Sequence, residues 1–356
     1  MSATLERETP QIQPERPWAK QNKSTLVANL VAVIIPTVLL AILFFVTDIP
    51  GPVLVVAFFF PVQLLTAGVT TFFDRGKRGL GDAVLSVACV TAFGLVVALL
   101  GSVVFSVIAR GLNTLSFSFI SQNNIYISPT TELSYGGVGH AILGTFLVVF
   151  IALIIAVPLG IASAIYITDI RGRAAGFVRF MVQAMSGVPS IVAGLFIFAA
   201  IILTDVVGFS AIAGGLAYAI LMLPTVARTA EEVLKLVPKD VRDAAVALGS
   251  SRARVTLMIV IPTAKTGLIT AVVLGIARVV GETAPLLLTT SNANNTNLNP
   301  FTNPVSTIPV YIFQFLGTGY ETSVARAWGA ALVLLVIVSI LFALTRLISR
   351  KKREKK

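Results

Sequence analysis

The sequence predicts an all-α polytopic membrane protein. Only 12% of its 356 residues are charged, which is about half the share in a typical soluble domain, and 56% are hydrophobic. The apolar residues gather in runs of roughly 20 residues, the length of helix that crosses a hydrocarbon core of about 30 Å. Because lipid cannot satisfy exposed backbone groups, these runs are expected to be helices.

Eight apolar segments are predicted to cross the membrane. They are 26–46, 52–73, 83–109, 141–168, 183–203, 209–227, 266–290 and 327–347. The fifth is interrupted by Ser186, Pro189 and Ser190, and we expect it inside the bundle, where neighbouring helices satisfy backbone groups that a proline frees. The segments 110–140 and 291–326 are rich in Asn, Ser, Thr and Gly, so they are predicted to be polar external loops.

The basic residues predict the orientation of these crossings. If the N-terminus is cytoplasmic, 24 of the 27 lysines and arginines lie in cytoplasmic segments, Arg110 and Arg326 lie outside, and Arg278 lies within the membrane. Because basic residues are enriched on the cytoplasmic side, both termini are predicted to be cytoplasmic in a cell (inner or plasma) membrane. The basic tail 351–356 is then expected to contact anionic lipid and not nucleic acid.

Motifs for nucleotide binding and catalysis are absent from the sequence. Its one Gly-Lys pair, Gly76-Lys77, is followed by Arg78 and not by the Ser or Thr of a P-loop. The sole histidine, His140, has no Cys, Asp or Glu neighbour, so it is predicted to be a surface or interfacial residue and not a metal ligand. We therefore expect neither an enzyme nor a chain that binds a metal or cofactor.

The longest predicted cytoplasmic segment, 228–265, has the pattern of two short helices joined by a glycine. Pro238 suits the start of a helix, and apolar residues follow on one helical stripe at Val241, Ala244, Ala245 and Leu248. Gly249 can end this helix in the left-handed conformation, and Ser250 or Ser251 can cap the next helix. The stripe alone would also suit an amphipathic helix on the membrane surface.

This segment resembles the EAA loop of binding-protein-dependent ABC importers. That pattern is Glu-Ala-Ala, three residues, Gly, nine residues and Ile-x-Leu-Pro, and both spacings occur here, with Asp in place of Glu and Ile in place of Leu. The resemblance implies a coupling helix that docks on a separate ATPase subunit. The residues that match the pattern are Asp243, Ala244, Ala245, Gly249, Ile259 and Pro262.

Three further stretches are similar to the permeases of phosphate importers. They are SGVPSIVAGLF (186–196), LMLPTVARTAEEVLKLVP (221–238) and GETAPLLLT (281–289), of which the last resembles the A-type subunit of the system. The resemblance covers roughly 83–350. It implies the six-helix core of a type I ABC importer permease (MetI-like), preceded by two extra N-terminal transmembrane helices.

The implied organisation is an N-terminal tail (1–25), two extra helices with a basic loop (26–80), a permease core (81–350) and a basic tail (351–356). By resemblance, the chain is the permease subunit of an ATP-driven phosphate importer. Its partners would be a C-type permease, a dimer of ATP-binding subunits that uses ATP and Mg²⁺, and an extracytoplasmic phosphate-binding protein. Two alternatives stay open: an importer of another oxyanion, such as sulfate or molybdate, and a membrane scaffold or sensor that transports nothing.

Arg278 and Glu282 are charges in the middle of an apolar run. Four residues apart, they would share one face of a continuous helix. A charge at the bilayer centre costs about 2.5–3.5 kcal/mol, so both are expected to face protein or water. Either the pair clamps helices together, or Arg278 lines the translocation path and binds phosphate oxygens while Glu282 limits the affinity. Thr283, Ser186 and Ser190 are further candidates for the path.

Overall fold

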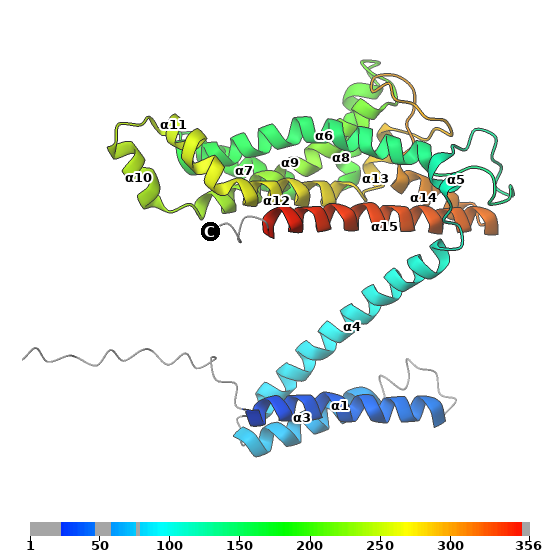
Figure 1. The fold of residues 1–356 in the computed structure, drawn as a ribbon, viewed down its shortest axis with the longest axis vertical. Helices are drawn as coiled ribbons and strands as arrows, with labels where there is room; N and C mark the ends of the chain where they lie inside the picture. The colour runs from blue at the N-terminus through cyan, green and yellow to red at the C-terminus, as the bar shows by residue number, and fades with distance from the viewer. Residues whose placement is uncertain (1–22, 47–57, 76–78, 351–356) are drawn as a thin grey trace, which may run out of the picture. The chain divides into compact units, whose positions relative to one another are not determined.

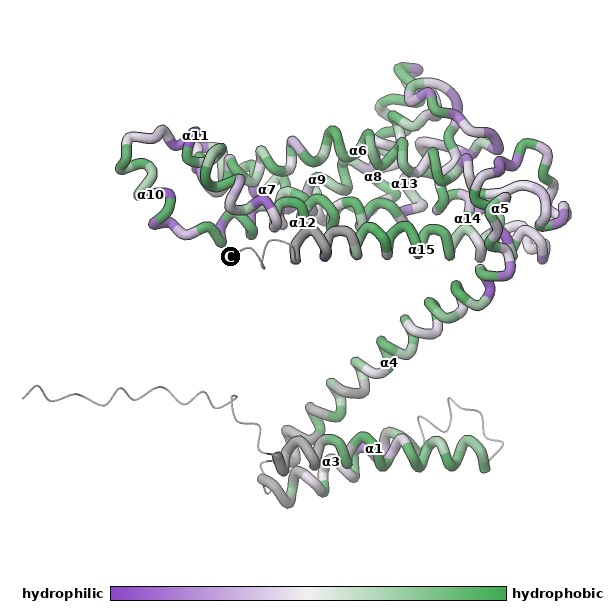
Figure 2. Tube along the Cα trace, viewed as in Figure 1, coloured by the Kyte–Doolittle hydropathy of each residue, from purple (hydrophilic) through white to green (hydrophobic). Residues whose placement is uncertain are grey.

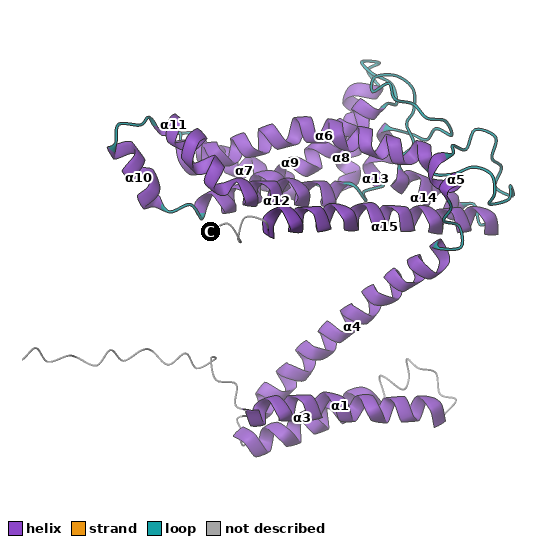
Figure 3. Cartoon of the chain, in the orientation of Figure 1, coloured by secondary structure: helices purple, strands orange, loops and turns teal. Residues whose placement is uncertain are grey.

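A computed structural model describes residues 23–46, 58–75 and 79–350. These residues form helices joined by loops and no strand (Figure 3). The N-terminal tail up to residue 22, the first part of the second predicted crossing and the C-terminal tail 351–356 lie outside the described residues. The chain divides into two units, 1–103 and 104–356. The domain boundary expected at residue 80 stays a prediction.

The first unit contains the two extra N-terminal helices and the first part of a long third helix. α1 (Lys23–Val46) packs against α3 (Phe60–Arg75), and α4 (Gly79–Gly111) follows and continues into the second unit. Residues 33–46 of α1 form an apolar helix shorter than a full span. α3 covers most of the second predicted crossing, 52–73.

The described residues contain five helices that are long and apolar enough to cross a membrane, and a bent pair of helices makes a sixth span. These six agree with the predicted crossings from 83–109 onward. They are Val87–Gly111, Gly139–Ile170, the pair Ala175–Ser186 and Ser190–Ile202, Ala211–Lys235, Arg252–Val279 and Glu321–Ala343. Figure 2 shows the apolar colour along most of their length.

The centre of the second unit is the packing of α6 (Gly139–Ile165) against α9 (Ala211–Lys235), which lie side by side (Figure 1). Small residues allow this close approach. A Cβ atom added to Gly215 would lie 2.4 Å from a side-chain carbon of Ile151, so only glycine fits there. Close packing across small residues is the usual way in which membrane helices associate.

The fifth predicted crossing, 183–203, is not one helix. α7 (Ala175–Ser186) begins earlier, and α8 (Ser190–Ile197) continues as the π-helical turn η4 (Phe198–Ile202) after a bend of 102°. The interruption that the sequence predicts is therefore confirmed. Pro189 stands just before α8 in an extended conformation. Because a proline has no N–H to donate and disfavours a helical conformation in the residue before it, α7 cannot continue through this position.

The boundaries around the seventh crossing also differ from those expected. α9 continues to Lys235, so the predicted loop 228–265 begins with about two helical turns. The predicted crossing 266–290 consists of α12 (Ile261–Val279), a non-helical break over 280–283 and the short α13 (Ala284–Thr289). Pro285 in the first turn of α13 explains why the helix restarts there.

The two predicted external loops contain helices. α5 (Phe117–Ser121) lies in the first, and α14 (Ile308–Gly317) lies in the second and packs on α15 (Glu321–Arg350). α14 was not expected because its apolar run is too short for a crossing. Its Tyr311 contacts His140, whose exposed fraction is only 3%. Of the surface or interfacial position predicted for this histidine, the surface position is therefore wrong.

Candidate functional site

The short helices that follow the two breaks, α8 and α13, lie against the central helix α9 and against one another. A Cβ atom on Gly194 of α8 would lie 2.6 Å from the Cα atom of Pro285 in α13, so these two short helices are in close contact. Tyr218 of α9 is fully buried, and its hydroxyl donates a 2.6 Å hydrogen bond to the backbone carbonyl of Glu282. The 280–283 break is thus held in one position by α8 and α9.

Two arginines lie beside these breaks. Arg278, in the last turn of α12, donates a 2.9 Å hydrogen bond from Nη1 to Oγ1 of Thr225 in α9. One turn further along α9, Nη1 of Arg228 lies 3.4 Å from Oγ of Ser186, the last residue of α7. Both arginine side chains are exposed in this chain. A hydroxyl group of α9 thus holds one guanidinium group, and a hydroxyl group of α7 holds the other.

The helix face that Arg278 and Glu282 were predicted to share does not exist, because α12 ends at Val279 and Glu282 lies in the break. In the described part of the chain, no ion pair joins the two side chains. Glu282 is half-buried. Whether Arg278 and Glu282 act on a solute stays a prediction.

Ser190 and Thr283 lie at the starts of the two short helices, at positions that differ by one residue. Ser190 is the first residue of α8, and Thr283 directly precedes α13 and accepts 3.1 Å hydrogen bonds at its carbonyl from Leu286 and Leu287. Both side chains are half-buried. Among the described residues, no hydrogen bond connects either of them to Arg278 or Arg228.

Sequence reasoning missed Thr225 and Arg228, because it placed residue 228 at the start of a cytoplasmic loop. The signal that could have identified them is the spacing of three residues within LMLPTVARTAEEVLKLVP, which brings both onto one face if this stretch is helical. The predicted crossing 209–227 included Thr225 but ended one residue before Arg228. In the structure the same helix, α9, continues through both residues to Lys235 and contains Pro224 at a buried position.

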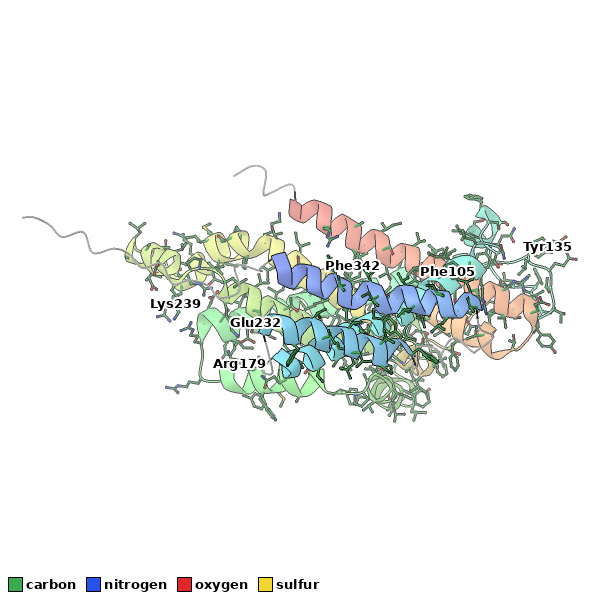
Figure 4. The ribbon with its side chains drawn as sticks, turned by 90° about the horizontal axis from the view of Figure 1, so that it is seen from below. Phe105, Tyr135, Arg179, Glu232, Lys239 and Phe342 are labelled. Carbon is green, nitrogen blue, oxygen red and sulfur yellow. The ribbon has the colours of Figure 1, made fainter. Side chains whose placement is uncertain are left out.

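A charged cluster fixes α7 to the end of α9. Arg179 donates from Nε and Nη2 to one carboxylate oxygen of Glu231, at 3.2 and 2.9 Å. Lys235, one turn later in α9, lies 2.9 Å from the same oxygen and 2.8 Å from Glu232. Glu231 is nearly buried, so these contacts compensate a carboxylate that would otherwise be costly in this position. Figure 4 labels Arg179 and Glu232 at this end of the unit.

The predicted glycine corner is confirmed. Pro238 directly precedes α10 (Lys239–Ala247), and Gly249 follows it with φ +85°, in the left-handed region. Ser251, not Ser250, caps α11 (Arg252–Val255) by accepting a 3.4 Å hydrogen bond from the backbone N–H of Arg254. The π-helical turn η5 (Thr256–Val260) then leads into α12.

α10 is attached to the bundle at one side only. Ala245 is buried and packs with Leu234, Val237 and Val255. Arg242 forms an ion pair with Asp169 of the π-helical turn η3 (Tyr166–Ile170) and donates to a backbone carbonyl of α9.

The rest of the predicted stripe does not face the bundle, since Val241 is 43% exposed and Leu248 is 87% exposed. Asp243, Ala244, Gly249 and Pro262 are exposed as well, and Ile259 is half-buried. Of the six predicted coupling residues, Asp243, Ala244, Gly249 and Pro262 therefore present an open surface, whereas Ala245 is buried.

Among the described residues, no group of three or more His, Cys, Asp or Glu side chains is placed to hold a metal ion. The side chains available at the helix breaks are arginines, hydroxyls and one carboxylate. Such a set favours reversible binding of an anion, which guanidinium and hydroxyl donors contact through its oxygens.

The family match and the relatives found by sequence agree on one family. The family described as "Binding-protein-dependent transport system inner membrane component" matches residues 156–354. The chain is 36% identical to the phosphate transport system permease protein PstA 1 of Mycobacterium tuberculosis, over 78% of this chain and 92% of that protein. It is 35% identical to PstA of Yersinia pestis, over 70% of this chain and 84% of that protein. An inward-facing methionine ABC transporter matches 60% of this chain and 94% of its own, with a TM-score of 0.49 and 17% identity.

Proposed function

Because the chain belongs to the family of binding-protein-dependent transport system inner membrane components, we propose that it is the permease subunit of an ATP-driven phosphate importer. It forms part of the translocation path, with both termini in the cytoplasm. Its partners are a C-type permease, an ATP-binding subunit dimer that uses ATP and Mg²⁺, and an extracytoplasmic phosphate-binding protein. The names of the relatives in Mycobacterium tuberculosis and Yersinia pestis support phosphate as the substrate.

The observation that carries this proposal is the pair of guanidinium groups at Arg278 and Arg228. Each is bonded to a neutral hydroxyl, and in the described part of the chain neither has a carboxylate partner. Their charge is therefore available to an anion. The planar fork of arginine matches the oxygens of phosphate in a bidentate geometry, which a lysine does not reproduce.

The cost of a charge inside a membrane supports a place on the translocation path. One arginine at the bilayer centre costs about 2.5–3.5 kcal/mol, and a neutral hydroxyl partner offsets only part of this. Both arginines are exposed in this chain. In the assembled importer they face water in the path between this chain and its C-type partner, where solvation is retained.

The helix breaks provide further groups for the same path. Ser190 begins α8, and the start of a helix carries a partial positive charge that attracts anions, as discontinuous helices do in other transporters. The hydroxyl of Thr283 at the second break is a further donor. The carboxylate of Glu282 adds negative charge at the break, which limits how tightly phosphate binds and allows its release.

Coupling to the ATPase occurs through α10 and the glycine corner. The exposed side chains of Val241 and Leu248 fit an apolar groove on the ATP-binding subunit, and Asp243 contacts its rim. Movement of α10 is transmitted to the bundle through the Arg242 ion pair with Asp169 and through buried Ala245.

The proposal is tested by purifying the tagged chain from its native membrane and identifying the bound subunits. We expect an ATP-binding subunit and a second permease. The complex in proteoliposomes, supplied with binding protein and ATP, should accumulate radiolabelled phosphate, and excess sulfate or molybdate should not compete. Competition by sulfate or molybdate would show that the substrate is another oxyanion and not phosphate. If no ATPase subunit copurifies, the result would favour a scaffold or sensor.

A further inference from the structure

A basic cavity lies where α7, the end of α9 and the start of α10 meet. Its volume is about 480 Å³, within the range of small-molecule sites. None of its lining residues is Asp or Glu. Figure 4 labels two of the basic residues, Arg179 and Lys239. The five basic residues that line it are Arg171, Arg179, Lys235, Lys239 and Arg242.

Three of these five cations already have carboxylate partners. Arg179 and Lys235 contact Glu231, Lys235 also contacts Glu232, and Arg242 contacts Asp169. In the described part of the chain, Arg171 and Lys239 have no such partner; Arg171 donates only a 2.9 Å hydrogen bond from Nε to the carbonyl of Thr168. Two of the five cations are thus left without an ion-pair partner among the described residues, and a further carboxylate, Asp243, lines a second cavity that shares Arg171 and Lys239.

Two helices also begin at the cavity wall. Ala175 is the first residue of α7 and Lys239 is the first residue of α10, and both line the cavity. The residues that precede them, Ala174 and Pro238, provide no side-chain cap for the helix. The N–H of Ala175 donates to the carbonyl of Gly172 at 2.9 Å. The next N–H groups at a helix start are unpaired within the helix and attract anions, so these two starts add to the field of the basic side chains. The acidic residue in the first turn of α10, Asp240, is not part of the lining.

We propose that this cavity binds a phosphate group, carried either by inorganic phosphate or by the headgroup of an anionic phospholipid. Arg171 and Lys239 contact the phosphate oxygens, and the bound group connects the start of α7 with the start of α10. An occupied cavity therefore restrains α10 relative to the bundle. Arg278 and Arg228 do not line this cavity, and the inference does not depend on the proposed transport of phosphate.

The test uses the full chain, purified in neutral detergent and stripped of lipid. The main variant combines Arg171→Gln with Lys239→Gln, since neither side chain belongs to an ion pair among the described residues and the fold should be retained. Arg173→Gln is the control. Arg173 is an exposed basic residue that lies, like Arg171, between η3 and α7, and it does not line the cavity. Thermal unfolding and the single variant Lys239→Gln check that any loss of binding is local.

Two binding measurements distinguish the sources of the phosphate group. Equilibrium dialysis measures radiolabelled inorganic phosphate, and native mass spectrometry measures retained phosphatidylglycerol against phosphatidylcholine. In one of these, the double variant should bind at least about tenfold more weakly than wild type, because two charge-assisted contacts are lost. The Arg173→Gln control should bind as wild type.

Two results would overturn the proposal. If the double variant and Arg173→Gln bind both ligands equally well, the basic cluster does not bind a phosphate group. Contact with an acidic protein surface would then be the remaining explanation for the cluster. If inorganic phosphate binding is lost in Arg278→Gln but kept in the double variant, the bound phosphate occupies the translocation path instead. The second result would leave the proposed transport function intact, so the failures of the two proposals are distinguishable.

Discussion

Replacing Arg278 with glutamine should lower phosphate uptake severely while the importer still assembles. Glutamine retains a donor for Thr225, to which Nη1 of Arg278 now donates at 2.9 Å, but it removes the positive charge and the fork. A hydrogen bond to a charged group contributes about 1.5–3 kcal/mol, and about 1.4 kcal/mol corresponds to a factor of ten. The expected loss is therefore about 10- to 100-fold in the initial rate of uptake at limiting phosphate.

The assay is uptake of radiolabelled phosphate by proteoliposomes containing the full importer, normalised to the amount of assembled complex. Thr225→Val is the matched control: it removes the neutral partner and keeps the charge, so its loss should be about tenfold or less. The double variant Arg278→Gln/Glu282→Gln separates transport from structure, because buried charged groups of purely structural use can often be replaced by neutral ones. Uptake near wild type in Arg278→Gln or in the double variant would refute a role in the path.

Three further predictions concern coupling, the helix break and orientation. Gly249→Val should abolish ATP hydrolysis stimulated by solute, because a β-branched residue does not tolerate φ +85°. The control Gly249→Asn should retain this stimulation. Normal stimulation in the valine variant would contradict a coupling role. Tyr218→Phe should lower the free energy of unfolding by about 1–3 kcal/mol, because the buried carbonyl of Glu282 loses its 2.6 Å donor, and an unchanged thermal midpoint in detergent would argue against this. A reporter that is active only outside the cell should be active after Ser121 and silent after Lys77, and activity at both positions would show that the first crossings are miscounted.

Local sequence patterns predicted the helices and the glycine corner. Apolar runs of about 20 residues predict spans wherever they occur, because the thickness of the bilayer sets the length that is needed. Gly249 was likewise identified from residue type and the cap was narrowed to Ser250 or Ser251, since a left-handed turn and a helix cap depend mainly on the residue and its immediate neighbours. The family pattern around Asp243 rests on the same local spacing.

Tertiary structure decided where the long helices break and what the charged residues contact. Tyr218 reaches Glu282 across 64 positions of sequence, and Arg278 reaches Thr225 across 53. The sequence pattern of an apolar run does not distinguish one helix from two, because the groups that stabilise a break lie on other helices. For the same reason Pro224 stays inside α9 while Pro189 stands at a bend. The residue type determines the free-energy cost of burying each polar or charged group, and only its neighbours in the folded structure decide which contacts offset that cost.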